Sequence, residues 1–390
     1  QNFSFLAFFG KIRHERCDVM AKKVIVGMSG GVDSAVSAYL LKQEGYEVEG
    51  LFMRNWDATL NNDVLGNPTL NDGICPQEKD YNDAKKTCEI LGIPLHRVDF
   101  IKEYWDNVFT YFLEELKKGR TPNPDLLCNK YIKFDVFKKE AKRLGANYMA
   151  TGHYARLENG KLLRGKDLNK DQTYFLAQLT PNQLQNVLFP VGNLTKEEVR
   201  KIAKEAGINV AEKKDSTGIC FIGERNFQKF IKNYLQPNPG DIINVETKEK
   251  IGTHTGLMNY TIGQRRNVGL SGFQERHYVC GKSVSKNELY VAFGEDNKYL
   301  MSDSCLLEQV NLISATHPAF CTAKFRYRGE DYPIQIEYLE NNEAKVSYPE
   351  GVKSVTPGQF CVFYLGEECL GSGIIKEVYK EGEKLWYLSD

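Results

Sequence analysis

The sequence predicts an α/β chain built as a doubly wound parallel sheet, followed by a small central domain and a C-terminal β-barrel. Three observations predict this fold. Short β-branched runs alternate with helical segments up to about residue 150, which is typical of a parallel sheet with helices on both faces. Helical periodicity fades near residue 230, and Pro237, Pro239 and Gly240 mark a boundary there. From about residue 302 the runs alternate as barrel strands do.

The first part begins with residues 22–28, KKVIVGM, a run that predicts a buried strand followed by a tight turn at 29–34. The elements expected next are a helix at 35–44, a strand at 48–53, a helix at 80–91, a strand at 94–100, helices at 101–118 and 132–144, and a strand at 148–151. Residues 54–79 form a polar stretch with little predicted structure, and a loop of that length is usually functional or mobile.

The second half predicts two smaller units. Residues 241–300 hold short strands and glycine-rich turns, and the barrel strands are expected at 321–327, 334–338, 344–348 and 359–364. We therefore divide the chain into an extension at 1–20, an α/β domain at 21–228, a central domain at 229–301 and a barrel domain at 302–390. Residues 1–20 combine an aromatic start with a basic piece just before Met20, and we interpret them as a non-native or disordered extension. A cleaved targeting segment is the alternative, which the scarcity of serine disfavours.

The composition is that of a soluble globular protein, with 42% apolar and 26% charged residues among 390. The 51 acidic and 51 basic residues balance, which neither requires nor excludes a nucleic-acid partner. No apolar run approaches the roughly 20 residues of a membrane helix, so we expect a cytoplasmic protein without membrane contact. The 10 cysteines form no C-x-x-C pair and no zinc-type cluster, so we predict no metal site. No secretory leader is visible, so we expect reduced thiols and at most a transient disulfide.

The turn SGGVDS at residues 29–34 lies between a predicted strand and a predicted helix. Its glycines let backbone N–H groups converge on an anion, and the helix behind adds its positive N-terminal end. Ser29 and Ser34 can donate to phosphate, and Asp33 can hold Mg²⁺ against it. No lysine follows as in a Walker A motif. A tight turn that merely requires glycine is the alternative, but the whole hexapeptide at the carboxyl end of a strand favours a nucleotide site.

Two cysteine motifs follow. In TPNPDLLCNK, at residues 121–130, the prolines Pro122 and Pro124 predict a stiff loop before the following helix. Cys128 lies near lysines and near the start of that helix, which can lower its pKa, and Asp125 is placed for general acid–base work. In KKDSTGICFIGER, at residues 213–225, Cys220 lies among apolar residues. Taken singly, a cysteine among apolar residues is more often inert core than a catalytic residue.

In combination these motifs are more specific. SGGVDS resembles the pyrophosphate loop of the ATP-pyrophosphatase (PP-loop) superfamily, whose fold is adenine nucleotide alpha hydrolase-like. Together with PNPDLLCNK and DSTGICFIG it resembles the tRNA-specific 2-thiouridylases of the MnmA/TrmU family. Residues 50–56, 150–156, 170–176, 260–265 and 324–328 also resemble family signatures. The resemblance runs from about residue 22 to the C-terminus, and the polar insert at about 61–73 lies outside the expected pattern.

The resemblance implies a sulfurtransferase that adenylates C2 of the wobble uridine in tRNA with ATP and Mg²⁺ and then thiolates it. Cys220 is expected to carry the persulfide, Cys128 to form a transient disulfide with it, and Asp125 to assist proton transfer. The residues expected to bind ATP are Gly27, Met28, Ser29, Gly30, Gly31, Val32, Asp33, Ser34, Met53 and Gly152. Expected partners are the tRNAs for Lys, Glu and Gln, and a cysteine desulfurase or sulfur-relay protein as persulfide donor.

The residues expected to contact tRNA are Asn123, Pro124, Asp125, Lys170, Asp171, Gln172, Arg326 and Tyr327. The central domain is also expected to bind tRNA. Nine basic and three acidic residues lie between Lys117 and Arg143 and can track phosphates, although a solvated helix face is the usual explanation of such a run. Two alternatives stay open: an amide-forming ligase of the same superfamily, which has no use for the cysteines, and a tRNA-binding protein without catalysis, which the intact loop disfavours.

Overall fold

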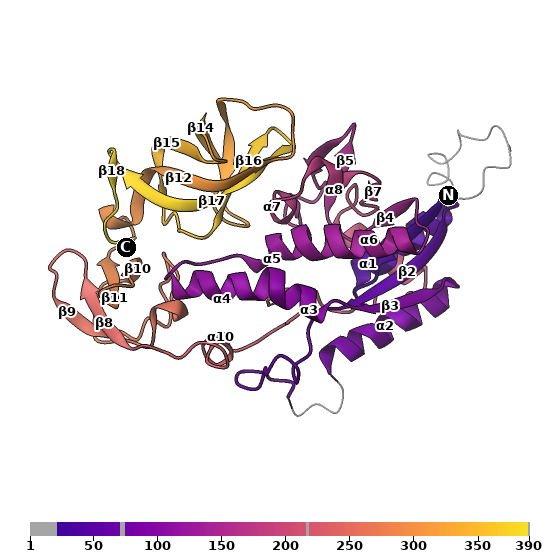
Figure 1. The fold of residues 1–390 in the computed structure, drawn as a ribbon, viewed down its shortest axis with the longest axis horizontal. Helices are drawn as coiled ribbons and strands as arrows, with labels where there is room; N and C mark the ends of the chain where they lie inside the picture. Colours follow the sequence, from indigo (N-terminus) through magenta and orange to yellow (C-terminus); the bar gives the residue numbers. More distant parts are fainter. Residues whose placement is uncertain (1–21, 71–74, 216–217, 389–390) are drawn as a thin grey trace, which may run out of the picture.

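The computed structural model describes residues 22–70, 75–215 and 218–388 and shows three units (Figure 1). The α/β unit lies at one end of the molecule, and the barrel and a small central sheet lie at the other, with the long helices of the chain running between them. The extension expected at residues 1–20 lies outside the described residues. Among the described residues, none of the helices combines the length and apolar character that a membrane crossing requires.

The α/β unit contains one parallel sheet with the strand order β3-β2-β1-β4-β7. Its strands are β1 (Lys23–Gly27), β2 (Glu47–Arg54), β3 (Leu95–Asp99), β4 (Tyr148–Ala150) and β7 (Val187–Leu188). Every neighbouring pair is parallel. The strands expected at 22–28, 48–53, 94–100 and 148–151 are confirmed. The short β7 adds to them, because two residues are too few to show a periodic pattern.

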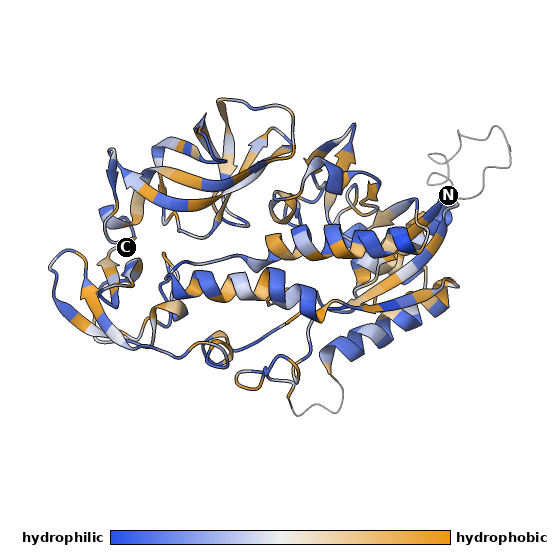
Figure 2. Cartoon of the chain, in the orientation of Figure 1, coloured by the Kyte–Doolittle hydropathy of each residue, from blue (hydrophilic) through white to orange (hydrophobic). Residues whose placement is uncertain are grey.

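Helices cover both faces of this sheet, which confirms the doubly wound fold. The helices are α1 (Val32–Gln43), α2 (Pro76–Leu91), α3 (Ile101–Tyr104), α4 (Thr110–Lys117), α6 (Phe137–Arg143) and α9 (Lys196–Glu205). Val24 and Val26 pack with α1 and α2 on one face, while Ile25 packs with the α3–α4 and α6 layer on the other. Figure 2 shows a mainly hydrophilic visible side of α2 beside a largely apolar β2.

Three helix boundaries differ from the sequence prediction. The helix α1 begins at Val32 rather than at residue 35, because the last residues of the glycine turn already have helical geometry. The helix α2 begins at Pro76, inside the stretch expected to be a loop, because proline is well suited to the first helical position. The helix expected at 132–144 begins at Pro124 as α5 (Pro124–Leu127) and continues through a π-helical stretch, Cys128–Val136, into α6.

The central unit is a four-stranded sheet in the order β10-β11-β8-β9. Its strands are β8 (Gly240–Asn244), β9 (Lys250–His254), β10 (His277–Ser283) and β11 (Glu288–Phe293). The pair β11–β8 is parallel and the other pairs are antiparallel. The short helix α10 (Phe227–Ile231) precedes this sheet and leads into it from the α/β unit.

The C-terminal unit is a closed antiparallel barrel. Its strands are β12 (Met301–Leu312), β13 (Phe320–Lys324), β14 (Tyr332–Tyr338), β15 (Ala344–Lys353), β16 (Phe360–Leu365) and β17 (Glu368–Lys380), with β18 (Glu383–Lys384) paired to β17. The sheet closes because β12 pairs with both β15 and β17. The barrel expected from the alternating pattern is therefore confirmed.

A hairpin from the α/β unit joins the barrel sheet, which the sequence pattern did not predict. The hairpin strands β5 (Ala155–Glu158) and β6 (Lys161–Arg164) follow β4, and β6 pairs with β17. Two short helices, α7 (Thr173–Leu176) and α8 (Pro181–Leu184), come next. The hydroxyl of Tyr174 on α7 donates to the carbonyl of Phe360 on β16 at 3.0 Å. The α/β unit and the barrel thus share a core.

Candidate functional site

The loop at residues 29–34 is preorganised by its own hydrogen bonds. The backbone N–H of Ser29 donates to Oγ of Ser34 at 3.2 Å, and that hydroxyl lies 3.1 Å from the carbonyl of Gly31. Gly30 has a φ of 72°, and a Cβ at this position would lie 2.3 Å from the carbonyl oxygen of Asp80 on α2. Only glycine fits this position, because it tolerates both the left-handed backbone and the close approach. The loop therefore has the shape of an anion cradle.

Asp33 lies at the centre of a charged network. Its carboxylate accepts hydrogen bonds from Nζ of Lys196 at 2.8 and 2.9 Å and from the hydroxyl of Tyr154 at 2.7 Å. Lys196 also pairs with Asp215 at 2.7 Å, and Lys170 pairs with the same carboxylate at 2.7 Å. Burial alone would raise the pKa of Asp215, but the hydrogen bonds from Lys170 and Lys196 outweigh it and bring this pKa to about 2. The network places the ammonium group of Lys196 beside the loop and holds it between two carboxylates.

The other residues expected to bind ATP surround the same loop. Met28 and Met53 are buried at the ends of β1 and β2. Gly152 follows β4, and a Cβ there would lie 2.8 Å from the backbone of Asp33 and Ser34. This spacing shows that the end of β4 packs directly on the loop. The ATP-binding residues stay a prediction, and the structure brings them together at one edge of the sheet.

The two cysteines of the sequence motifs lie side by side. Cys128 is fully buried at the start of the π-helical stretch, so it lies within a helix and not in a loop before one. Cys220 lies in a tight turn closed by a bridge between Ile219 and Gly223. The Sγ atoms are 3.6 Å apart although 92 residues separate them. Ser216 and Thr217 of the second motif lie outside the described residues.

The surroundings shift the pKa values of the two thiols in opposite directions. The hydrogen bond from Cys128 lowers the pKa of Cys220, against an opposing effect of burial, and the charge of Lys133 lowers it further. Burial raises the pKa of Cys128 well above its ordinary value, and the hydrogen bond to Cys220 adds to this. Cys220 is therefore the better thiolate of the pair, because the thiolate is favoured where the pKa is low.

Asp125 links the two cysteine motifs. It lies about one helical turn before Cys128 in the chain. Its Oδ1 accepts a hydrogen bond from the backbone N–H of Cys220 at 3.2 Å. Burial raises the pKa of this carboxyl, although the hydrogen bond from Cys220 and the charge of Lys133 oppose the effect. A carboxyl with a raised pKa keeps its proton to higher pH than an ordinary aspartate and is a better proton donor for it.

The residues expected to contact tRNA have structural partners in this conformation. Asn123 caps α5 by accepting from the backbone N–H of Asp125 at 3.2 Å, and Pro124 is the first residue of that helix. Buried Asp171 accepts from Gly165 at 3.0 Å. Gln172 accepts from the backbone N–H of Tyr154 at 2.9 Å. These residues stay a prediction for tRNA.

The two barrel candidates lie at different contacts. The guanidinium of Arg326 donates to the carbonyls of Ile262 and Ser354, each at 2.7 Å, and so bridges the central unit and the barrel. The ring of Tyr327 lies 4.3 Å from that of Phe175, centroid to centroid, in the α7 layer. Both residues stay a prediction for tRNA as well.

Sequence reasoning missed two contributors to the site. Lys196 is the first residue of α9, where a positive charge is unfavourable next to the helix dipole, and that misplaced charge was the available signal. Tyr104 looked like an ordinary core residue of an amphipathic helix, yet its hydroxyl donates to the carbonyl of Cys220 at 2.8 Å. Among the described residues, no group of three or more His, Cys, Asp or Glu side chains is arranged to hold a metal ion.

A glycine cradle at the carboxyl end of a central parallel strand, with two adjacent thiols, defines a PP-loop protein with a dithiol site. The family models agree with this class. Residues 22–224 match the tRNA methyl transferase HUP domain, residues 228–293 the tRNA methyl transferase PRC-barrel domain, and residues 302–375 the aminomethyltransferase beta-barrel domain.

Curated relatives narrow the class. The chain is 55% identical to the tRNA-specific 2-thiouridylase MnmA of Mycoplasma capricolum subsp. capricolum, over 93% of this chain and 100% of that protein. It is 53% identical to the protein of the same name from Acholeplasma laidlawii, over 94% of this chain and 100% of the relative. The chain belongs to the tRNA-specific 2-thiouridylase family, which confirms the resemblance drawn from the three motifs.

Similarity to solved structures is weaker. A 4-thiouridine synthetase solved as an RNA complex with bound ATP matches with a TM-score of 0.33 and 17% identity, over 52% of this chain and 46% of that one. A similarity this low supports no conclusion about function.

Proposed function

We propose that this protein is a tRNA-uridine 2-sulfurtransferase that uses ATP to activate C2 of the wobble uridine and a cysteine persulfide to replace its oxygen. The observation that carries the proposal is the 3.6 Å separation of the Cys128 and Cys220 sulfur atoms, with the lower pKa on the Cys220 side. An amide-forming ligase has no use for such a pair. Membership of the 2-thiouridylase family supports the same reaction.

The first step is activation of the uridine. ATP with Mg²⁺ binds over the loop at residues 29–34, and Asp33 is the loop carboxylate able to hold the ion against the phosphates. The C2 oxygen of the base attacks the α-phosphate, and pyrophosphate leaves. The oxygen then departs as AMP when sulfur attacks, which is the chemical reason for using ATP. Asp125, with its raised pKa, is placed to carry protons in these steps.

The second step is sulfur transfer. Cys220 accepts a sulfane sulfur from a donor protein, a cysteine desulfurase or sulfur-relay protein, and the terminal sulfur of its persulfide attacks C2 as AMP leaves. Cys128 then attacks Sγ of Cys220 and breaks the bond between Sγ and the sulfur that is now attached to C2. The 2-thiouridine is released, and a Cys128–Cys220 disulfide remains on the protein. A dithiol reductant restores both thiols by exchange. The observed sulfur contact supports this step because the two sulfur atoms, 3.6 Å apart, need only a short approach to reach the roughly 2.05 Å of a disulfide bond.

The tRNA contacts complete the proposal. The target base must leave its stack to reach the thiols, which an anticodon loop permits more readily than a duplex. Asn123, Pro124 and Asp125 adjoin Cys128 in the chain and are proposed to meet the base. Lys170, Asp171, Gln172, Arg326 and Tyr327, with the central unit, are proposed to bind the rest of a tRNA for Lys, Glu or Gln.

The test is transfer of labelled sulfur to unmodified tRNA in the presence of ATP, a cysteine desulfurase and reductant. We expect 2-thiouridine with wild type and none with Cys220→Ser or Cys128→Ser. The matched control is Cys305→Ser, because Cys305 is buried in the barrel, away from the thiol pair. Sulfur incorporation that survives in both active-site variants would refute the disulfide step. A wild type that forms AMP and pyrophosphate but never thiolates tRNA would favour the ligase.

A further inference from the structure

Segment 57–70, part of the polar stretch 54–79 that the sequence pattern set apart, carries a fully buried carboxylate. Asp63 is 0% exposed, and its Oδ2 accepts from Nε of Arg225 at 2.9 Å, from Nη2 of Arg225 at 2.8 Å and from Nε1 of Trp56 at 3.0 Å. The Arg225 side chain is only 5% exposed. A buried ion pair adds little net stability compared with apolar residues of similar volume, so its value here is positional. Arg225 lies five residues after Cys220.

Other contacts bind the same segment to the chain that follows Cys220. The backbone N–H of Asn226 donates to the carbonyl of Gly66 at 2.9 Å, and a Cβ on Gly66 would lie 2.6 Å from the carbonyl oxygen of Asn226. Leu65 exchanges two hydrogen bonds with the side chain of Asn233, at 2.9 and 3.1 Å. The hydroxyl of Tyr234 donates to the carbonyl of Asn61 at 2.9 Å. Segment 57–70 is thus fastened along residues 225–234.

The turn that carries Cys220 depends on outside contacts for its shape. Gly218 has a φ of 96° and Phe221 a φ of 64°, and a phenylalanine in the left-handed region is strained. On the entry side, residues 216 and 217 lie outside the described residues. The turn itself is held by Asp125 at the Cys220 N–H and by Tyr104 at the Cys220 carbonyl. Gln77 adds a third contact, because its Nε2 donates to the carbonyl of Phe221 at 2.7 Å. Where the chain leaves the turn, Arg225 holds it through the ion pair with Asp63.

We infer that Asp63 is a positioning residue for sulfur transfer: through Arg225 it fixes the exit of the Cys220 turn and so keeps the Cys220 sulfur beside that of Cys128. Asp63 is held in place because Trp56, which donates a hydrogen bond to it, packs against Phe109 in the core of the α/β unit, with ring centroids 4.9 Å apart. The inference rests on the proposed use of Cys128 and Cys220 in sulfur transfer. Asp63 touches neither sulfur and acts only through Arg225.

The experiment measures how readily the two thiols form a disulfide. Whole protein is equilibrated in glutathione buffers, in which the two thiols and oxidised glutathione give the Cys128–Cys220 disulfide and two molecules of reduced glutathione. The bridged peptide is quantified by mass spectrometry after an acid quench. We expect Asp63→Asn to lower this equilibrium constant about tenfold, because the neutral amide loses the charge-assisted pair with Arg225. Affinity for ATP should match that of wild type, since the loop at 29–34 is untouched.

A matched control and a second variant keep the result interpretable. Asp331→Asn breaks the Arg164–Asp331 pair, 2.6 Å long, at the hairpin–barrel contact, and should leave the equilibrium constant unchanged. The double variant Asp63→Asn with Arg225→Gln avoids an unpaired buried charge, so it folds where the single variant is unstable, and should show a similar loss. A folded single or double variant with a wild-type equilibrium constant would overturn the role of Asp63 alone. A wild type that forms no Cys128–Cys220 disulfide would overturn both this role and the proposed dithiol chemistry.

Discussion

Lys133 contacts the thiol pair on one side and His153 on the other. Its Nζ lies 3.5 Å from Nε2 of His153, and burial followed by the Lys133 charge lowers the pKa of that imidazole well below its ordinary value. Burial alone would lower the pKa of Lys133, but the charges of Cys220, Cys128 and Asp125 raise it instead. Lys133 therefore stays positively charged and His153 stays neutral. The positive charge of Lys133 favours the thiolate form of Cys220.

The first prediction concerns this lysine. Lys133→Gln should raise the pKa of Cys220, so that its reaction with iodoacetamide at pH 7 slows about tenfold and the pH profile moves to higher pH, since one pKa unit is a factor of ten in thiolate. Peptide-resolved alkylation rates between pH 6 and 10 would measure it. Lys130→Gln is the matched control, because Nζ of Lys130 contacts Gln178 at 3.0 Å and not the thiols. An unshifted profile in Lys133→Gln would contradict the assignment.

A second residue-scale prediction concerns Lys196. Its ammonium group is held against Asp33 beside the phosphate loop, so Lys196→Ala should weaken ATP binding about tenfold by removing a positive charge next to the triphosphate. Isothermal titration with a non-hydrolysable ATP analogue would measure the affinity. Lys204→Ala, on the same helix but paired with Glu212, should bind as wild type does. Equal affinities for the two variants would show that Lys196 serves Asp33 and Asp215 alone.

At the scale of elements, sequence patterns predicted what local physics controls. The strands β1 to β4 and the glycine turn were predictable because β-branched runs and glycines act over a few residues. The helical position of Cys128 was not predicted, because Pro122 and Pro124 suggested a loop while Pro124 in fact begins α5. The pairing of Asp33 with Lys196 spans 163 residues, and no local pattern encodes a contact of that range.

The glycine turn supplies a prediction at this scale. Gly30 and Gly207 both have a left-handed backbone, with φ of 72° and 66°. A Cβ added at Gly30 would also clash with Asp80, whereas a Cβ added at Gly207 would have no atom within 4 Å. We expect Gly207→Ala to lower the free energy of unfolding by about 1 kcal/mol and Gly30→Ala by about 3 kcal/mol, with loss of ATP binding only in the latter. Urea unfolding and ATP titration would measure both. Similar losses in the two variants would contradict the close approach of α2.

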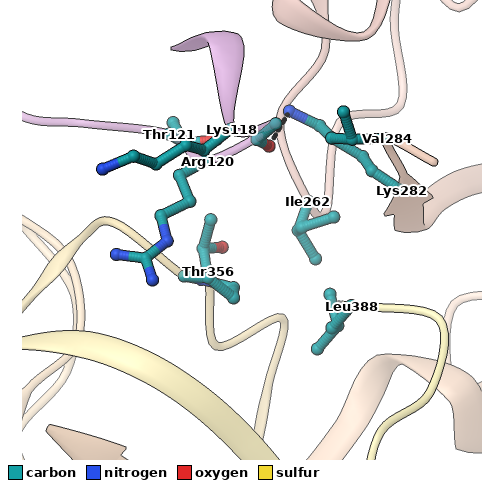
Figure 3. Close-up of a pocket in the computed structure, with 10 residues that line it drawn as sticks. Lys118, Arg120, Thr121, Ile262, Lys282, Val284, Thr356 and Leu388 are labelled. Carbon is teal, nitrogen blue, oxygen red and sulfur yellow. Dashed lines mark hydrogen bonds between the residues drawn. The ribbon is translucent and has the colours of Figure 1, made fainter. Parts of the chain in front are cut away.

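At the scale of the whole molecule, the three units meet around a small pocket of about 30 Å³ (Figure 3). Lys282 of β10 is buried there, and its Nζ donates to the carbonyl of Gly119, just after α4, at 3.0 Å. Burial lowers the pKa of Lys282 to about 7. Lys118 and Arg120 also line the pocket. The nearby carboxylates of Glu115 and Glu308 pair with Arg120. Among the described residues, no carboxylate is hydrogen-bonded to Lys282.

This junction makes the stability of the protein depend on pH. Between pH 7 and about 10 the unfolded chain holds a proton on Lys282 that the folded chain has released, so stability rises with pH across that window. Lys282→Met should therefore stabilise the protein by about 2 kcal/mol at pH 6, and its advantage should shrink toward pH 9. Unfolding in urea at four pH values would measure this, with exposed Lys286→Met as the control. A constant difference between Lys282→Met and wild type at all pH values would argue against the lowered pKa.

The whole-molecule arrangement also shows where sequence reasoning stops for the site. The motif pair predicted two working cysteines, yet their contact depends on the turn at 218–223, on Tyr104 and on segment 57–70, which come from distant parts of the chain. A turn with a strained Phe221 has no distinctive sequence pattern, because its geometry is imposed by tertiary contacts.

The pairing of β6 with β17 has a consequence for dissecting this protein. A fragment cut after residue 224 would keep the whole PP-loop sheet but would leave β6 without its barrel neighbour, and would uncover apolar side chains of α7 that pack against β16. An exposed strand edge beside an apolar surface is a template for association with other chains. Minimal versions of the enzyme made by trimming at the family-model boundary are therefore expected to aggregate, and a fragment designed to avoid this must keep the barrel through β17.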